Sequence, residues 1–364
     1  MTQQYLYASL GLNMAYQEQE QQVILHSPDI QTGSTTKRKE QEPLQGEIIF
    51  IVGGASGTGR LLTTEAHRLG ARVIASSTSP EKLDTLTTEL GEGLHTFVAD
   101  LTKPEQFYEG LTQLIKHDGI VPTAIVHSAA GGMEGFSQKL VNDLRRLRTI
   151  RRTKNPQEFE EALEKIRKET ETQVLNPENI AAAIQVNFYG HAITLSLLKE
   201  LLPTNAKAKD IYWSSTWSDL GKIHSAFKDQ NDTSQEIGID VPIFYSGVAG
   251  SKGRFLRWQK QHASDLVNSG IYPAVVSGHI INGSDAGRMI DTFIFSTLLP
   301  KEQHEEMKKY YITQQDMVNA TIDLIQSDPT TWPEYPHRVF VVGGRPVSKD
   351  LLPNDQMFKV KIPL

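Results

Sequence analysis

Short apolar segments recur along the chain from residue 47 onward, and segments with helical periodicity lie between them. The apolar segments are continuous rather than alternating, which is typical of parallel strands buried on both faces of a sheet. Repeated alternation of strand and helix predicts an α/β fold built on a doubly wound parallel sheet. The predicted strands are residues 48–52, 72–76, 95–99, 123–127, 210–214, 272–277 and 338–342.

Two helical segments interrupt this alternation at about residues 136–175. Each has apolar residues three or four positions apart, which gives a helix one buried face. The second segment opens with Asn155 as a cap, Pro156 at the first helical position and Glu158 at the third. We therefore predict an inserted helical hairpin. Its predicted buried positions are Leu140, Leu144 and Leu147 on the first helix, and Phe159, Leu163 and Ile166 on the second.

The two ends of the chain differ in composition from its centre. Residues 1–45 are polar and rich in Gln, Glu, Thr and Lys, which predicts a partly flexible N-terminal extension. Residues 46–350 hold the predicted strands and helices, and residues 351–364 form a C-terminal tail. The expected organisation is a single sheet domain that carries the helical insertion.

Composition excludes several classes of function. The 37 Lys and Arg residues stand against 43 Asp and Glu, and this net charge of −6 argues against a general nucleic-acid binder. The chain has no cysteine, which excludes disulfides, thiolate metal sites and a cysteine nucleophile. No apolar run approaches the roughly 18 residues of a membrane span, and the first residues do not resemble a signal peptide. We expect a soluble cytoplasmic protein without a metal site.

The first predicted strand runs directly into GGASGTGR, residues 53–60, which opens a predicted helix. Glycines at 53, 57 and 59 would let the backbone turn tightly and approach a pyrophosphate closely, next to the positive end of the helix. The loop lacks the Gly-Lys-Ser/Thr ending of a nucleotide-triphosphate loop. In this strand–helix context it predicts a dinucleotide site in a Rossmann-type sheet.

The spacing of this loop resembles that of the short-chain dehydrogenase/reductase family. The family's Thr-Gly-x-x-x-Gly-x-Gly stands here as residues 52–59, with Val52 in place of the threonine. Further family motifs follow in order over residues 47–348. They are Asp100 in VADLT, the HSAA segment at 127–130 where Asn-Asn-Ala-Gly is usual, Asn187 in QVNFYG, Ser215 in YWSSTW, Lys252, and the final RVFVVGG.

The catalytic tyrosine departs from the family's most common pattern. Most members carry Tyr-x-x-x-Lys, which would place the tyrosine at Ala249. Tyr245 instead precedes Lys252 by seven positions, similar to the Tyr-x6-Lys of the family's enoyl-thioester reductases. Seven helical positions fall about 20° short of two turns, so both side chains would share one helix face. Asn187 and Ser215, in contrast, resemble the carbonyl-reducing majority.

The resemblance implies catalytic roles for Tyr245, Lys252, Ser215 and Asn187. Tyr245 would donate a proton to the substrate oxygen, with Ser215 as a second donor. Lys252 would hold the nicotinamide ribose and lower the pKa of the tyrosine, and Asn187 would hold a water connecting this lysine to solvent. The implied cofactor-binding residues are Gly53, Ser56, Gly57, Thr58, Gly59, Arg60, Ser77, Thr78, Asp100, Leu101, Ser128, Ala129, Ala130 and Lys252.

Several of these residues have plainer interpretations. Asn187 could satisfy local backbone groups within its helix, and Ser215 could cap a turn, with Ser214 as the substitute catalytic serine. His127 is expected to be a packed residue at a strand end near the cofactor rather than an acid or base.

Cofactor choice depends on the segment ASSTSPEK after the second strand. It offers Ser76, Ser77 and Thr78 and has no acidic residue before Glu81. An acidic residue here would bind the ribose hydroxyls and repel a 2′-phosphate. Arg60 could reach the same phosphate, so NADP(H) is expected in preference to NAD(H).

The resulting hypothesis is an NAD(P)(H)-dependent oxidoreductase that transfers a hydride to or from a carbonyl or alcohol. The alternatives are an enoyl-thioester reductase acting on acyl-carrier-protein or CoA substrates, and a non-catalytic dinucleotide-binding regulatory protein. The basic segment RRLRTIRRTK, Arg145–Lys154, is either a helix end whose cations suit the dipole or a docking patch for coenzyme A or an acyl carrier. The resemblance also implies a homodimer or homotetramer.

Overall fold

The computed structural model describes residues 42–131, 137–152, 155–222, 224–227 and 239–347. Most of the predicted N-terminal extension (1–41), the C-terminal tail and Lys154 lie outside the described residues.

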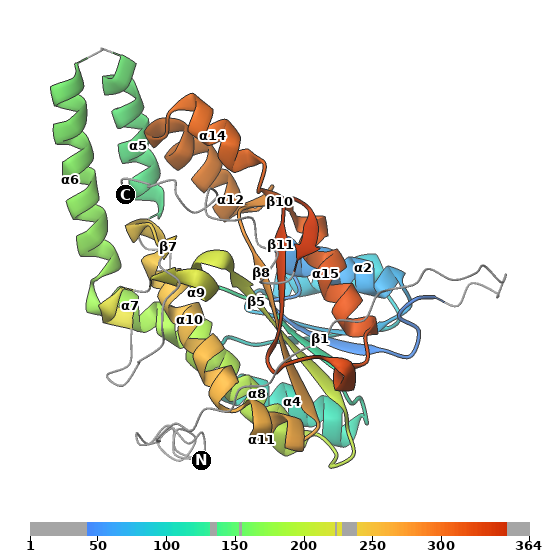
Figure 1. Ribbon diagram of the computed structural model, residues 1–364. Helices are drawn as coiled ribbons and strands as arrows, with labels where there is room; N and C mark the ends of the chain where they lie inside the picture. Colours follow the sequence, from blue (N-terminus) through green and yellow to red (C-terminus); the bar gives the residue numbers. More distant parts are fainter. Residues whose placement is uncertain (1–41, 132–136, 153–154, 223, 228–238, 348–364) are drawn as a thin grey trace.

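The described chain forms one eight-stranded sheet in the order β12-β11-β8-β5-β4-β1-β2-β3 (Figure 1). Seven neighbouring strands are parallel, and only β12 pairs antiparallel to its neighbour. The sequence-predicted strands and the doubly wound α/β fold are therefore confirmed. The strands are β1 Ile48–Val52, β2 Arg72–Ser77, β3 Leu94–Val98, β4 Ala124–His127, β5 Ala208–Ser215, β8 Ile271–Gly278, β11 His337–Val342 and β12 Arg345–Val347.

The central strands β1, β2, β4, β5 and β8 are buried on both faces because helices cover the sheet on both sides (Figure 1). Ile49 and Ile51 of β1 pack in one apolar cluster with helices α2 and α15, whereas Phe50 and Val52 pack in another with α4, α8 and α10. This double burial explains why the strands read as continuous apolar runs. These helices are α2 Gly57–Arg68, α4 Pro104–Thr112, α8 His191–Leu201, α10 Ser246–Gln261 and α15 Gln314–Gln326, with α3 Pro80–Leu90 also on the α2 side.

The strand order reverses between β1 and β4, because the chain first builds outward through β2 and β3 and then returns to the other side of β1. In open parallel sheets, ligands bind outside the carboxyl ends of the strands at such a reversal. The topology thus places the glycine loop, which follows β1, at the expected binding edge.

The inserted hairpin consists of α5 Ser137–Arg152 and α6 Pro156–Val174, which extend beyond the sheet (Figure 1). The Asn155 side chain accepts a hydrogen bond from the backbone N–H of Glu158 at 3.3 Å, which is the cap expected from the sequence. Leu144 and Leu147 are fully buried on α5, and the predicted face of α6 is largely buried as well.

The continuous helical segment Pro177–Leu201 is long and apolar enough to cross a membrane by length and composition, and 56% of the tested window is buried inside the protein. It is a helix of the core, made of α7 Pro177–Ile184, the π-helical turn η2 Gln185–Gly190 and α8. No such segment was expected from the sequence, and this was wrong. His, Asn and Tyr residues interrupt the apolar run, but the mean hydropathy of the segment is still high enough for a membrane span.

The remaining elements connect or cover these layers. They are η1 Gln113–His117, α9 Thr216–Leu220, β6 Gly221–Lys222, η3 Ser225–Phe227, β7 Ile239–Asp240, η4 Ile243–Tyr245, α11 Ala263–Asn268, β9 Ile281–Asn282, α12 Asp285–Met289, η5 Ile290–Phe295, α13 Ser296–Leu298, α14 Lys301–Lys308, β10 Ile312–Thr313 and η6 Pro329–Thr331.

Candidate active site

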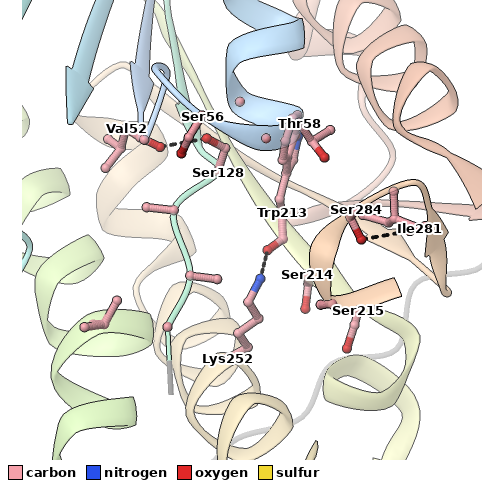
Figure 2. A pocket seen from close by; sticks show the side chains of 18 of the residues that line it. Val52, Ser56, Thr58, Ser128, Trp213, Ser214, Ser215, Lys252, Ile281 and Ser284 are labelled. Atoms are coloured by element: carbon pink, nitrogen blue, oxygen red, sulfur yellow. Dashed lines mark hydrogen bonds between the residues drawn. The ribbon is translucent and has the colours of Figure 1, made fainter. Parts of the chain in front are cut away.

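A cavity of about 610 Å³ lies at the carboxyl ends of β1, β2, β4, β5 and β8 (Figure 2). Its volume is in the range of sites that hold a small-molecule ligand. It brings together most of the residues that the sequence singled out, from the glycine loop to the tyrosine and the lysine. The predicted residues that line it are Gly53, Ser56, Gly57, Thr58, Gly59, Ser77, Thr78, Asp100, Leu101, Ser128, Ala129, Ala130, Ser215, Tyr245 and Lys252.

The glycine loop has the shape that a pyrophosphate requires. Gly53 and Gly57 adopt φ values of +85° and +54°, which residues with a Cβ rarely adopt. A Cβ at Gly59 would lie too close to the Gly53 carbonyl oxygen, and 2.6 Å from the Ser128 hydroxyl, which is also too close. Ser56 is the N-cap of α2, and its side chain makes no capping hydrogen bond. The first N–H groups of α2 therefore remain available for an anion in the cavity.

The tip of β2 forms the part of the cavity where the adenosine ribose is expected. The Ser76 hydroxyl is buried and has no hydrogen-bond partner among the described residues. Ser77 and Thr78 lie beside it, and no carboxylate of β2 lines this part of the cavity. A buried polar atom without a partner is unfavourable in the protein alone, so a polar ligand group fits this position.

Arg60 does not line the cavity, contrary to its expected role at the ribose phosphate. Its guanidinium forms an exposed ion pair with Glu89 of α3, with Nη2 2.5 Å from a carboxylate oxygen. Glu89 lies 29 positions away in the sequence, and the pairing follows from the packing of α2 beside α3. Arg60 is thus directed toward a neighbouring helix.

Ser215 and Tyr245 meet at the opposite end of the cavity. Ser215 ends β5 and caps α9, because its hydroxyl accepts a hydrogen bond from the backbone N–H of Ser218 at 3.2 Å. The same hydroxyl also hydrogen-bonds the Tyr245 side chain. Ser215 therefore caps α9 and faces the cavity at the same time.

Tyr245 does not lie on the helix that carries Lys252. It ends the 3₁₀ turn η4 and is the residue immediately before α10, and both side chains line the same cavity. Burial raises the pKa of the Tyr245 phenol, and the hydrogen bond from Ser215 partly offsets this rise. The expected lowering of this pKa by Lys252 is not what the structure shows.

Lys252 is only 7% exposed and points into the cavity from α10. Its Nζ donates a hydrogen bond to the Trp213 carbonyl at 2.8 Å (Figure 2) and lies 5.6 Å from the centre of the Tyr212 ring. Burial lowers the pKa of Lys252 to about 8, because the low-dielectric surroundings disfavour the ammonium.

Asn187 is fully buried and does not line the cavity. Its side-chain amide accepts from the backbone N–H of Gly131 at 3.1 Å and donates to the Gly131 carbonyl at 2.8 Å and to the Ser251 hydroxyl at 2.9 Å. Its own carbonyl accepts from the Tyr212 hydroxyl at 3.0 Å. The asparagine therefore holds the segment that follows Ala129 and Ala130, and not backbone groups within its own helix.

A series of buried, hydrogen-bonded polar side chains also supports this segment. Of these residues, only His127 was named from the sequence. The Ala129 carbonyl lies 3.0 Å from His191 Nε2, which must donate because a carbonyl only accepts. His191 Nδ1 then accepts from His127 Nδ1 at 2.9 Å, which leaves His127 Nε2 facing Asp210 at 2.8 Å. His127 is thus a packed strand-end residue, as expected. Burial holds the pKa of His191 well below its usual value, consistent with this neutral form.

Three further residues that the sequence analysis did not assign, Thr216, Trp217 and His279, line the tyrosine end of the cavity. The Trp217 ring lies 5.0 Å from the Tyr245 ring and 5.7 Å from the His279 ring. His279 Nδ1 lies 2.9 Å from the Thr216 hydroxyl, and burial lowers the pKa of His279 to about 4. The buried Ser214 hydroxyl has no hydrogen-bond partner among the described residues and lies beside Ser215 (Figure 2). A buried polar residue directly after an apolar strand is the signal that could have found them.

Comparison with known proteins agrees with this geometry. Residues 47–151 match the family model described as short chain dehydrogenase. Cis-2,3-dihydrobiphenyl-2,3-diol dehydrogenase of Paraburkholderia xenovorans (strain LB400) is 31% identical over 99 residues, which are 27% of this chain and 35% of that protein. The chain thus spans about a third of that relative's length.

Solved structures share the fold over a longer range. A short-chain type dehydrogenase/reductase from Mycobacterium ulcerans has a TM-score of 0.56 at 15% identity, over 82% of this chain and 90% of that one. The 3-ketoacyl-(acyl-carrier-protein) reductase from Brucella melitensis complexed with NADH has a TM-score of 0.55 at 15% identity, over 83% and 99%. Residues 47–151 thus match the short chain dehydrogenase family model, and the sheet shares its fold with these two solved structures.

Proposed function

We propose that this protein is an NAD(P)(H)-dependent oxidoreductase that transfers a hydride between the cofactor and a carbonyl or alcohol. The observation that carries the proposal is a single cavity that joins the glycine loop to Ser215, Tyr245 and Lys252. The diol dehydrogenase named above, which matches 27% of the chain, supports the same class of reaction. The bound cofactor would supply the hydride, and the protein would supply placement and electrostatics.

The cavity residues have separate roles in the proposed reaction. The Tyr245 phenol, whose pKa is raised by burial, stays protonated near neutral pH and can donate a proton to a substrate oxygen. The Ser215 hydroxyl lies within hydrogen-bond reach of Tyr245 and stabilises negative charge on the same oxygen. Lys252, directed into the cavity between the loop and the tyrosine, would hold a ribose hydroxyl.

NADP(H) remains the proposed cofactor in preference to NAD(H). Ser76, Ser77 and Thr78 offer hydroxyls and no carboxylate at the end of β2, so nothing there repels a 2′-phosphate. The ion pair of Arg60 with Glu89 removes one argument for this preference, because Glu89 neutralises the nearby cation. The preference therefore rests on the serines and the threonine.

One observation favours a second function, the reduction of an enoyl thioester. Tyr245 lines the cavity seven positions before Lys252, and this spacing resembles that of the enoyl-thioester branch. The Brucella melitensis neighbour is named for a ketoacyl substrate on an acyl carrier, so thioester substrates belong in the test of either function.

The test is to follow cofactor absorbance with NADPH and NADH, against a panel of ketones and a short enoyl thioester. We expect turnover of ketones with NADPH, and a Tyr245→Phe variant slower by about a hundredfold or more. Tyr108→Phe is the matched control, because Tyr108 is exposed and does not line the cavity. Turnover of the thioester alone would select the second function, and binding without any turnover would contradict both.

A further inference from the structure

The segment after β8 closes the tyrosine end of the cavity. It runs through β9, α12, η5 and α13, and we call residues 279–298 the lid. Six of its residues besides His279 line the cavity on this side, namely Ile280, Ile281, Ser284, Ala286, Gly287 and Ile290. A substrate beside Tyr245 would therefore contact the lid.

The inserted hairpin holds the lid by arginine side chains. Helix α5 packs against η5 and α13 of the lid. Arg148 donates to the Thr292 carbonyl and the Ser296 hydroxyl, and Arg151 donates to the Thr297 carbonyl at 2.6 Å. These carbonyls lie at or near the C-terminal end of the lid helix, where the helix dipole is negative and a cation is favoured.

A phenylalanine of the lid packs against two arginines of the hairpin. The Arg145 and Arg148 guanidinium groups lie 5.2 and 6.0 Å from the centre of the Phe293 ring. Cation–π contacts of this length are attractive. Three arginines of the basic segment are thus engaged with the lid, which argues against the expected docking patch for a carrier or coenzyme A.

The second helix of the hairpin packs on the catalytic tyrosine's own turn. Helix α6 contacts η4, the 3₁₀ turn that ends with Tyr245, and its residues Leu163 and Ile166 share one buried cluster with Phe244. Tyr245 is the N-cap of α10, and its backbone N–H donates to the Pro242 carbonyl at 2.9 Å within η4. The packing of η4 against α6 therefore supports the segment that leads through Tyr245 into α10.

We propose that the α5–α6 hairpin positions the lid and Tyr245 as one unit, so that Arg148 and Arg151 are positioning residues for substrate binding. The two helices pack along each other, so a displacement of the lid at α5 also displaces the surface on which η4 rests. This inference rests on the proposed function, since it assigns the substrate side of the same cavity.

The test compares the Arg148→Ala/Arg151→Ala variant with wild type by steady-state kinetics and by amide hydrogen exchange. We expect KM for the substrate to rise about tenfold, since charge-assisted hydrogen bonds to the lid are lost, with the affinity for NADPH unchanged. Exchange across residues 285–298 and 243–245 should accelerate together, because the two segments share one support. Arg148→Lys should recover only part of the loss, since lysine lacks the forked donor geometry.

Arg146→Ala is the control, because two helical positions place Arg146 about 200° around α5 from Arg148. It should change neither KM nor exchange. Faster exchange in the lid with unchanged exchange at 243–245 would overturn the coupling, and unchanged exchange in both would overturn the whole inference. Hydrogen exchange does not require turnover, so these outcomes stand apart from a failure of the proposed function, which would appear as no cofactor binding in wild type.

Discussion

Replacing Lys252 by methionine should make the protein more stable near neutral pH while it removes activity. Methionine keeps most of the length of the side chain and removes its charge. In the folded protein the Lys252 ammonium is almost completely buried, and the only hydrogen bond described for its Nζ goes to the Trp213 carbonyl. No anionic group is described as a source of its pKa shift, which arises from burial.

The size of the effect follows from the pKa of Lys252, which falls from 10.5 to about 8 on folding. Below pH 8 the lysine is charged in both folded and unfolded states, and the folded state carries a cost of about 3 kcal/mol. Between about pH 8 and 10.5 the folded protein releases its proton first, so its free energy of unfolding rises by this amount. Loss of the hydrogen bond to Trp213 offsets about 1 kcal/mol, which leaves Lys252→Met about 2 kcal/mol more stable at pH 7.

The assay is urea unfolding of both proteins, without cofactor, at a series of pH values from 7 to 10.5. The stability difference between variant and wild type should be largest at pH 7 and shrink as the pH rises. Lys260→Met, on the exposed side of the same helix, is the control and should show no such trend. A difference that stays constant with pH, or a variant less stable than wild type at pH 7, would refute the reasoning.

Two further substitutions test the support of the cofactor loop. Asp210→Ala should lower the free energy of unfolding by about 3 kcal/mol, because it leaves His127 and Gln259 without their buried partner. Asp210→Asn should cost less than about 1 kcal/mol, since an amide of the same shape still offers a polar group to both side chains. Equal losses in urea unfolding would contradict this. Gly59→Ala should reduce NADPH affinity at least about tenfold in a fluorescence titration, because its Cβ would displace the Gly53 carbonyl. Unchanged affinity would show that the loop relaxes without cost.

The sheet could be predicted from the sequence because each strand is a continuous apolar run between glycines and helical segments. A continuous apolar run does not reveal which side of the sheet each side chain faces, since helices cover both sides. Ile49 and Phe50 look alike in the sequence, yet they belong to separate clusters on opposite sides of the sheet. The hairpin was predictable from the Asn155 cap, but not where it packs, because Arg148 meets the lid 144 or more positions further along the chain.

The glycine loop, Ser215 and Lys252 were found because motif spacing fixes their place at the ends of consecutive elements. Arg60 was misassigned because its partner, Glu89, lies on a helix whose packing the sequence does not reveal. The helical position of Tyr245 was misjudged for a similar reason. Seven-residue spacing is compatible with a continuous helix, but α10 begins only at Ser246.

Burial at the tyrosine end favours one direction of proton transfer. Reduction requires a neutral phenol at the substrate oxygen, whereas oxidation of an alcohol requires a phenolate to accept the proton. The raised pKa of Tyr245 stabilises the phenol, and Lys252 is oriented toward the Trp213 carbonyl instead of toward this hydroxyl. The lowered pKa of His279 keeps a neutral ring nearby and adds no cation that would stabilise a phenolate. For the proposed oxidoreductase we therefore predict that reduction of a ketone near neutral pH is faster than oxidation of the corresponding alcohol, and that the oxidation rate rises at alkaline pH as Tyr245 deprotonates; an oxidation rate that does not rise with pH would contradict this.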